Sequence, residues 1–162
     1  FVAIYLLFFQ ISDVVPIAGL GTHFGLILVY LGGSIGFNSW LIKGFMDTIS
    51  PSLDEAAKVD GATEYQIFSR IIVPLSRPIL VVIFVITFIG IYSDFILAAI
   101  FLKDVNLWTV AVGINTVFVD DFNADWGVIA ASSVIAATPI AVLFIFFQKQ
   151  ITGGLTAGSV KG

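Results

Sequence analysis

The sequence contains no cysteine and few charged residues, and both absences narrow what the protein can be. Without cysteine there is no disulfide, no thiolate nucleophile and no cysteine-ligated metal. Charged residues make up 11% of the chain, against about a quarter in a typical soluble domain. The seven Lys and Arg residues are scattered singly in a chain of net charge -4, so no basic stripe could follow a phosphate backbone. We therefore expect no nucleic-acid partner.

Motifs for catalysis and for metal binding are also missing from the sequence. There is no Gly-x-x-x-x-Gly-Lys phosphate loop, no His-Glu-x-x-His zinc motif and no pair of carboxylates inside an apolar segment. The single histidine, His23, has no second histidine or paired acids nearby and is better explained as an interfacial residue than as a metal ligand. We expect no catalytic residue, no metal site and no cofactor.

Apolar residues dominate what is present, and they predict an all-α, polytopic membrane helix bundle. Hydrophobic residues make up 59% of the 162 residues, and the mean hydropathy is +1.08. A span needs about 20 apolar residues. Three stretches meet this length, namely 24–43, 78–102 and 126–148. The apolar run at 1–9 is too short, and we expect it to be the end of a helix whose beginning is missing; a short interfacial stretch is the alternative.

The positions of Lys and Arg predict the orientation, because loops near the membrane retain an excess of them on the cytoplasmic side. Four of the seven flank or lie in the long loop 44–77, and two belong to the tail 149–162. Lys103 alone falls elsewhere. We therefore expect loop 44–77 and the C-terminus to be cytoplasmic, and the acidic loop 103–125 to be external.

The long cytoplasmic loop carries two consecutive helix-start patterns. Ser52 with Glu55, and Thr63 with Gln66, each fit a capping box. Gly61 lies between them, where a helix can stop in a left-handed conformation. The loop is thus predicted to form two short helices joined at a sharp turn. The small side chains of the first helix, rimmed by charge, indicate a partner-binding helix, with a plain solvated connector as the alternative.

The same loop resembles the EAA loop of ABC importer permeases. The matching residues are Glu55-Ala56-Ala57, Gly61, Ile71 and Val73-Pro74, with Val73 where the family has Leu. The likeness extends to 16–33, 104–113 and 154–162, which are similar to the second permease subunit of maltose-type importers. It therefore covers nearly the whole chain, and its spacing in the loop is specific.

The resemblance implies a prokaryotic inner-membrane, multi-pass permease with the type I transmembrane fold of ABC importers. It implies a companion permease subunit as heterodimer partner, two ATP-binding subunits that hydrolyse ATP, and an extracytoplasmic sugar-binding protein. It further implies an ATPase-coupling role for Glu55, Ala56, Ala57, Gly61 and Pro74. By the same likeness, the tail would insert at the ATPase interface through Gly154, Leu155, Thr156, Ala157, Gly158 and Lys161.

Two further places are candidates for function. Asp94 is the one ionisable side chain inside an expected span, where such residues are costly and often functional. It could belong to the substrate pathway, pair with another helix, or lie near enough to the outer surface to be wet. The outer loop with Asp120, Asp121, Phe122 and Asn123 could touch the sugar-binding protein, as the likeness implies, while nearby aromatic residues could simply hold the chain at the lipid head groups.

Two other functions compete with the importer permease. An ion-coupled secondary transporter would be expected to show inverted repeats and broken helices around a midplane site, and the sequence makes neither evident. A membrane-embedded enzyme lacks the motifs described above. The preferred hypothesis is an ATP-driven, binding-protein-dependent permease for maltose, maltodextrin or a related oligosaccharide.

Overall fold

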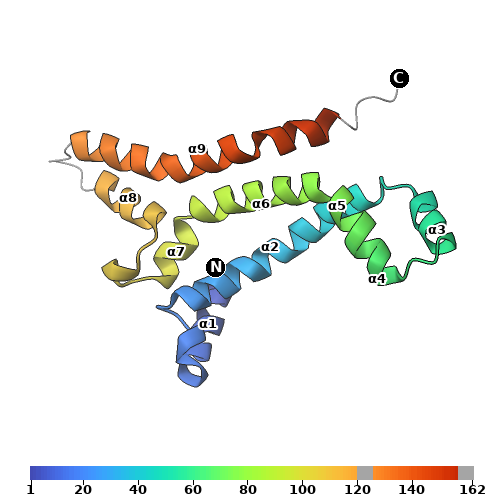
Figure 1. The fold of residues 1–162 in the computed structure, drawn as a ribbon. Coiled ribbons are helices and arrows are strands. Elements are labelled where there is room, and N and C mark those ends of the chain that lie inside the picture. The colour runs from blue at the N-terminus through green and yellow to red at the C-terminus, as the bar shows by residue number, and fades with distance from the viewer. Residues whose placement is uncertain (120–125, 157–162) are drawn as a thin grey trace. The chain divides into compact units, whose positions relative to one another are not determined.

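The computed structural model describes residues 1–119 and 126–156, and for 117–119 and 151–156 the backbone alone. Every regular element in these ranges is helical, which confirms the all-α prediction (Figure 1). The elements are α1 (Val2–Val14), η1 (Pro16–Ala18), α2 (His23–Met46), α3 (Pro51–Val59), α4 (Glu64–Ile67), η2 (Phe68–Ile72), α5 (Val73–Leu75), α6 (Arg77–Tyr92), α7 (Ile96–Phe101), η3 (Val105–Leu107), α8 (Val110–Val119) and α9 (Trp126–Thr156).

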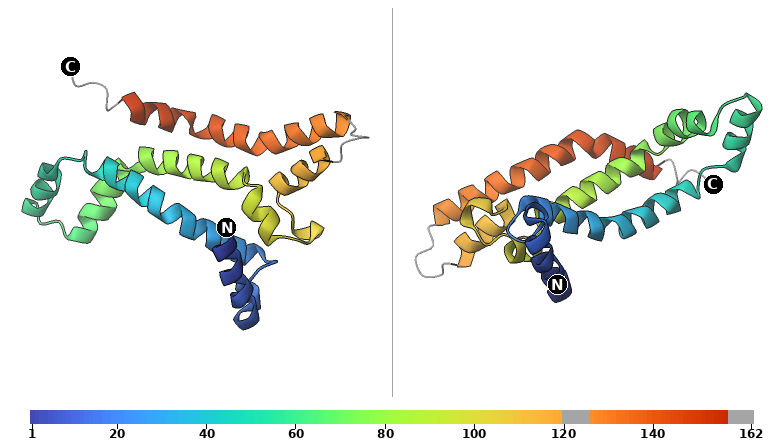
Figure 2. Two further views of the ribbon diagram at one scale, coloured as in Figure 1. Left: turned by 180° about the vertical axis from the view of Figure 1, so that it is seen from behind. Right: turned by 90° about the horizontal axis from the view of Figure 1, so that it is seen from below.

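Two helices are long and apolar enough to cross a membrane, α2 over His23–Met46 and α9 over Trp126–Gln150. They cover the expected spans 24–43 and 126–148. At about 1.5 Å per residue, each exceeds the thickness of a bilayer core of roughly 30 Å. Figure 2 shows both as continuous helices, and α9 continues through Pro139. Few of their apolar side chains are buried within the described residues, as expected of helices that face lipid or other subunits.

The third expected span, 78–102, is not one helix. α6 ends at Tyr92, and α7 begins only at Ile96, after a short non-helical link. Before α6, the helical stretch Glu64–Leu75 meets it at a bend of 63°. Composition predicts how apolar a stretch is, but it does not reveal where the backbone leaves the helical path. Two other segments also differ from expectation, since α1 continues beyond Phe9 to Val14 and the expected loop 103–125 contains helix α8.

The chain forms two compact units, and α2, α6 and α9 each contribute to both. The first unit comprises Phe1–Ile35 and Thr87–Leu143. Its apolar core joins α1, the start of α2, α7 and α8 through Phe8, Leu26, Ala98, Phe101, Leu102 and Val112. The rings of Phe8 and Phe101 meet edge to face with centroids 5.2 Å apart. Gly21 N–H also donates to the carbonyl oxygen of Phe101 at 2.9 Å, which fixes the end of α7.

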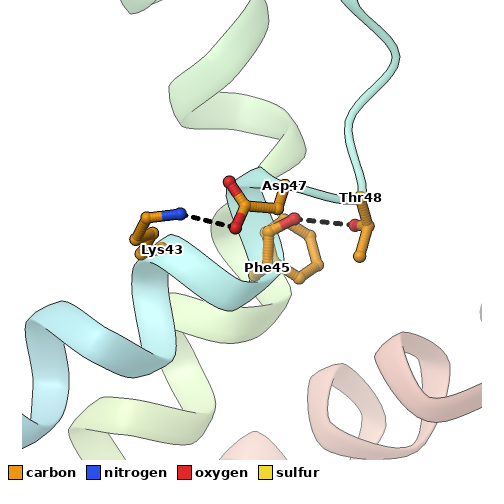
Figure 3. A network of polar contacts seen from close by, with 4 residues as sticks. All are labelled: Lys43, Phe45, Asp47 and Thr48. Atoms are coloured by element: carbon orange, nitrogen blue, oxygen red, sulfur yellow. Dashed lines mark hydrogen bonds and ion pairs between the residues drawn. The ribbon is translucent and has the colours of Figure 1, made fainter.

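The second unit comprises Gly36–Ile86 and Phe144–Gly162, and it contains the long loop. Two polar contacts between neighbouring residues hold the end of α2, as Figure 3 shows. Lys43 Nζ lies 2.7 Å from Asp47 Oδ2, and Thr48 Oγ1 donates to the carbonyl oxygen of Phe45 at 2.7 Å. A cation in the last turn also complements the negative end of the helix dipole. The chain therefore leaves α2 in a defined way before it enters α3.

Candidate functional site

The segment from α3 to α5 is the first candidate site, and its first helix, α3, begins at Pro51. Pro51 occupies the first helical position and Ser50 is the N-cap, with its backbone extended. The expected Ser52–Glu55 capping box is therefore not formed, because both residues already lie inside the helix. Glu55 is exposed and makes no hydrogen bond within the described part of the chain. Its carboxylate is thus available at the surface.

Gly61 ends α3 in a Schellman motif. Its φ of +79° lies in the left-handed region, as the sequence predicts. Ala62 N–H donates to the carbonyl oxygen of Ala57 at 2.9 Å, and Gly61 N–H donates to that of Lys58 at 3.0 Å. These bonds satisfy carbonyl groups that the end of a helix would otherwise leave unpaired. They also reverse the chain tightly, and α4 begins at Glu64, three positions after Gly61 (Figures 1 and 2).

The second expected capping box is confirmed at the start of α4. Gln66 N–H donates to Thr63 Oγ1 at 3.3 Å, and Thr63 N–H donates to Gln66 Oε1 at 2.8 Å. An ion pair then joins the two helices, with Lys58 Nζ 2.8 Å from Glu64 Oε1. The hydrogen bond to Glu64 and the negative charge of Glu64 raise the pKa of Lys58, so the lysine stays charged at physiological pH. The turn is therefore held by backbone bonds and by side chains.

The outer surface of this segment combines charge, small side chains and exposed apolar groups. Ala57 is buried against the segment, whereas Ala56 and Glu55 face outward. Val59 is 88% exposed and Tyr65 is 78% exposed. These are large values for apolar side chains in a loop that is expected to lie in water and not in lipid. We call the surface formed by Glu55, Ala56, Val59 and Tyr65 the α3–α4 face.

The base of the segment connects to α2 and α6. After α4 the backbone passes through η2, a π-helical turn of five residues, and Pro74 lies in the short helix α5. Such π turns are rare and recur at functional sites. Ser76 is 1% exposed, and its Oγ donates to the carbonyl oxygen of Ile72 at 2.7 Å and lies 3.7 Å from Met46 Sδ. Both ends of the loop therefore meet at one buried point.

Asp94, the second candidate, is engaged in structural contacts. Its Oδ1 accepts hydrogen bonds from Leu97 N–H at 2.9 Å and Ala98 N–H at 3.3 Å, so Asp94, one position before the N-cap Phe95, satisfies two N–H groups in the first turn of α7. The same oxygen accepts a bond from Tyr30 Oη of α2 at 3.0 Å. Of the three interpretations open from sequence, this geometry favours a partner to another helix. Sequence reasoning did not identify Tyr30, since a tyrosine in an apolar helix carries no local signal of its partner.

The remaining candidate residues belong to the outer loop and to the C-terminal tail. Asp120, Asp121, Phe122 and Asn123 lie outside the described residues, as do Ala157, Gly158 and Lys161. Gly154, Leu155 and Thr156 form the last turn of α9. No group of three or more His, Cys, Asp or Glu residues that could hold a metal ion is found among the residues that the structure describes.

Comparison with known proteins identifies the family. The family model described as "binding-protein-dependent transport system inner membrane component" matches residues 1–156. The chain belongs to this family. The match covers nearly the whole chain, including residues 55–74, which resemble the EAA loop of ABC importer permeases. The helical fold agrees with membership in a family of inner-membrane components.

Three curated relatives of this inner-membrane component share one name. The chain is 46% identical to the maltose/maltodextrin transport system permease protein MalG of Photorhabdus laumondii, 47% to that of Vibrio vulnificus and 45% to that of Escherichia coli K12, each over 161 residues. Each match covers 99% of this chain and 54% of the relative. The chain thus spans about half the length of these relatives.

Proposed function

We propose that the chain forms part of the permease subunit of an ATP-driven, binding-protein-dependent importer of maltose, maltodextrin or a related oligosaccharide. Family membership and the name shared by the relatives support this substrate class. The subunit itself does no chemistry, and ATP hydrolysis belongs to two partner subunits. The chain's task is to convert motion of those subunits into alternating access of a pathway through the membrane.

The α3–α4 face is the observation that carries the proposal. A docking surface needs accessible groups that can contact a partner protein. The side chain of Glu55 is exposed and makes no hydrogen bond within the described part of the chain. Beside it, Ala56 lets a partner approach the helix backbone closely, and exposed Val59 and Tyr65 offer apolar area. Burying such area contributes about 25 cal/mol per Å². An ATPase subunit with a basic residue facing Glu55 fits this surface.

Transmission of motion needs a segment that moves as one body, and the local bonds provide it. The Schellman turn at Gly61, the Thr63–Gln66 capping box and the Lys58–Glu64 ion pair hold α3 and α4 together. The buried contact at Ser76 joins the base of this segment to α2. A push on α3 would therefore reach the membrane helices without being absorbed by a loose loop.

The other parts of the assembly follow from the same proposal. Loop 44–77 and the C-terminus lie in the cytoplasm, a companion permease completes a heterodimer in the inner membrane, and a sugar-binding protein docks outside. The segment 154–161 reaches the ATPase interface, and residues 120–123 contact the binding protein. Asp94 joins α2 to α7, which supports a structural more than a substrate-contacting role.

Substitution of Glu55 by Gln tests the proposal in the complete importer reconstituted in proteoliposomes. Glu55 caps nothing, so Glu55→Gln leaves α3 intact and removes only the charge. We expect maltose-stimulated ATP hydrolysis to fall more than tenfold, because breaking a buried charge pair costs about 2 kcal/mol or more and about 1.4 kcal/mol is already a factor of ten. Asp47→Asn, which removes an exposed carboxylate outside α3, should change it little. Unchanged coupling in Glu55→Gln would defeat the ion-pair claim, and maltose uptake driven by an ion gradient without ATP would overturn the proposed function.

A further inference from the structure

A groove of about 510 Å³ lies in the second unit, between the start of α6 and the end of α9. Its volume is within the usual range for pockets that bind small molecules, roughly 300–1,000 Å³. The wall is apolar along its length and polar at one end. The apolar residues are Leu80, Val81, Phe84 and Phe147, and the polar residues are Arg77 and Gln150.

Two aromatic rings form the floor of the apolar part. Phe84 and Phe147 meet edge to face with ring centroids 5.7 Å apart, which joins α6 to α9. Phe84 nevertheless remains 51% exposed, and Leu80 remains 39% exposed. Ile83 and Val85, on the same helix, are buried. The protein thus covers one part of α6 and leaves the groove side open, where an apolar ligand would remove further area from solvent.

The polar end of the groove carries positive charge. α6 and α9 contain no Asp or Glu, and the charged residues in their sequences are Arg77 and Lys149. Arg77 is exposed, and its guanidinium makes no hydrogen bond or ion pair with any residue that the structure describes. Asp47, just after the end of α2, is already paired with Lys43 at 2.7 Å. The guanidinium therefore offers its five N–H donors to an anion from outside the chain.

The length of the groove fits one leaflet of a bilayer. α6 and the preceding stretch Glu64–Leu75 form a bent pair that is apolar enough to be one span. Arg77 is the first residue of α6, and Phe84 lies about 10 Å further along the helix at roughly 1.5 Å per residue. Half of a hydrocarbon core of roughly 30 Å is longer than this. The charge thus lies at the membrane surface and the rings lie at acyl-chain depth.

We propose that this groove binds one anionic phospholipid, whose phosphate accepts hydrogen bonds from Arg77 and whose acyl chain covers Phe84 and Phe147. Guanidinium and phosphate match in charge and in geometry. A free anion would leave the apolar wall uncovered, whereas an uncharged lipid would leave the cation unpaired. In the orientation of the proposed function the lipid belongs to the cytoplasmic leaflet, whose anionic lipids attract basic residues. The site goes beyond sugar import and takes only its leaflet from that proposal.

The position of Arg77 gives the bound lipid a structural task. Arg77 directly follows Ser76, the buried residue at which both ends of the long loop meet. Leu80, in the groove wall, donates its N–H to the carbonyl oxygen of Ser76 at 3.0 Å. A lipid held here therefore braces the junction between the coupling segment and the membrane helices.

Native mass spectrometry of the complete importer tests the headgroup contact. The complex is released from nanodiscs that contain equal amounts of phosphatidylglycerol and phosphatidylcholine with the same acyl chains. We expect the wild type to retain one phosphatidylglycerol more than Arg77→Gln, with a preference of about fivefold that corresponds to about 1 kcal/mol for one arginine near the surface. Arg77→Lys should keep most of the preference. Arg70→Gln is the matched control, since Arg70 is exposed in the same unit and does not line the groove.

A second pair of variants tests the acyl-chain contact. Leu80→Phe places a ring in the groove and should lower the retained phosphatidylglycerol to the level of Arg77→Gln. Ile86→Phe is its control, because Ile86 is exposed on the same helix and lies outside the groove wall. The yield of the assembled complex, measured for every variant, reports folding separately.

The outcomes distinguish lipid from other occupants. Equal retention of the two lipids by the wild type, or unchanged retention in Arg77→Gln and Leu80→Phe, would overturn the site and show ordinary surrounding lipid. Displacement of the lipid by glycerol phosphate, which has no acyl chain, would show a free-anion site instead. Loss of the companion permease from Leu80→Phe with an unchanged lipid count would make the groove a subunit interface. A wild-type complex that retains phosphatidylglycerol but shows no maltose-stimulated ATP hydrolysis would defeat the proposed function and leave the lipid site standing.

Discussion

Replacement of Gly61 is the sharpest test of the coupling segment, because its cost is conformational. The φ of +79° is open to glycine, costs other residues about 1–2 kcal/mol, and is tolerated better by asparagine. A Cβ added at Gly61 would meet nothing within 4 Å, so no steric clash confuses the result. We therefore expect the order Gly, Asn, Ala from best to worst.

The expected size follows from the Schellman bonds. If Gly61→Ala cannot hold the left-handed turn, the bonds from Gly61 to Lys58 and from Ala62 to Ala57 open together. A cost of about 1–2 kcal/mol lowers the ratio of closed to open turn roughly fivefold to thirtyfold. The fold of the membrane helices does not depend on this turn, so insertion should be unaffected.

The assay is the number of maltose molecules imported per ATP hydrolysed in proteoliposomes, with the amount of subunit in the membrane fraction measured alongside. We expect the ratio to fall in the order given above while the amount stays constant. Gly44→Ala is the matched control, since Gly44 lies in α2 of the same unit with open space around it and no positive φ. Equal ratios for Gly61, Asn and Ala would refute the reasoning, as would an equal loss in Gly44→Ala.

Two further predictions concern Asp94 and the tail. Asp94→Asn keeps an acceptor oxygen for α7 and Tyr30 and should retain stability and the KM for maltose. Asp94→Leu removes the acceptor of two N–H groups in the first turn of α7, a loss comparable to that of a helix cap at about 1–2 kcal/mol, and should lower the melting temperature of the complex at an unchanged KM. A raised KM in Asp94→Asn with normal stability would instead support direct contact with the substrate. Deletion of residues 154–162 should reduce the transport-to-ATP ratio more than the amount of subunit in the membrane, and equal losses in both would contradict a role at the ATPase interface.

Local chemistry made much of the loop predictable. Gly61 and the Thr63–Gln66 pair act over three or four residues, so the sequence indicates their turn and cap without knowledge of the fold. The Ser52–Glu55 capping box was wrong for an equally local reason. Pro51 suits the first helical position, which moves the helix start two residues earlier and makes Ser50 the N-cap. Two plausible starts competed, and the proline decided between them.

The broken span could not be predicted in the same way. Residues 78–102 are apolar apart from Asp94, and composition suggests a single helix. In the structure, Asp94 Oδ1 takes the backbone N–H groups of Leu97 and Ala98, which starts a new helix in a new direction. The same oxygen accepts the hydroxyl of Tyr30, 64 residues earlier in the chain, and no local pattern reveals that long-range partner.

The sequence by itself determined that this chain is a cysteine-free, all-helical membrane component whose long loop contains a capped helix start and a glycine stop, because hydropathy and caps are properties of short stretches. Only the tertiary structure decided which side chain pairs with Asp94, and only it brought Arg77 and Phe147 to one groove. Those relations join residues far apart in the chain, and they depend on how helices pack around the break between α6 and α7 and along α6 and α9. No local pattern encodes that packing.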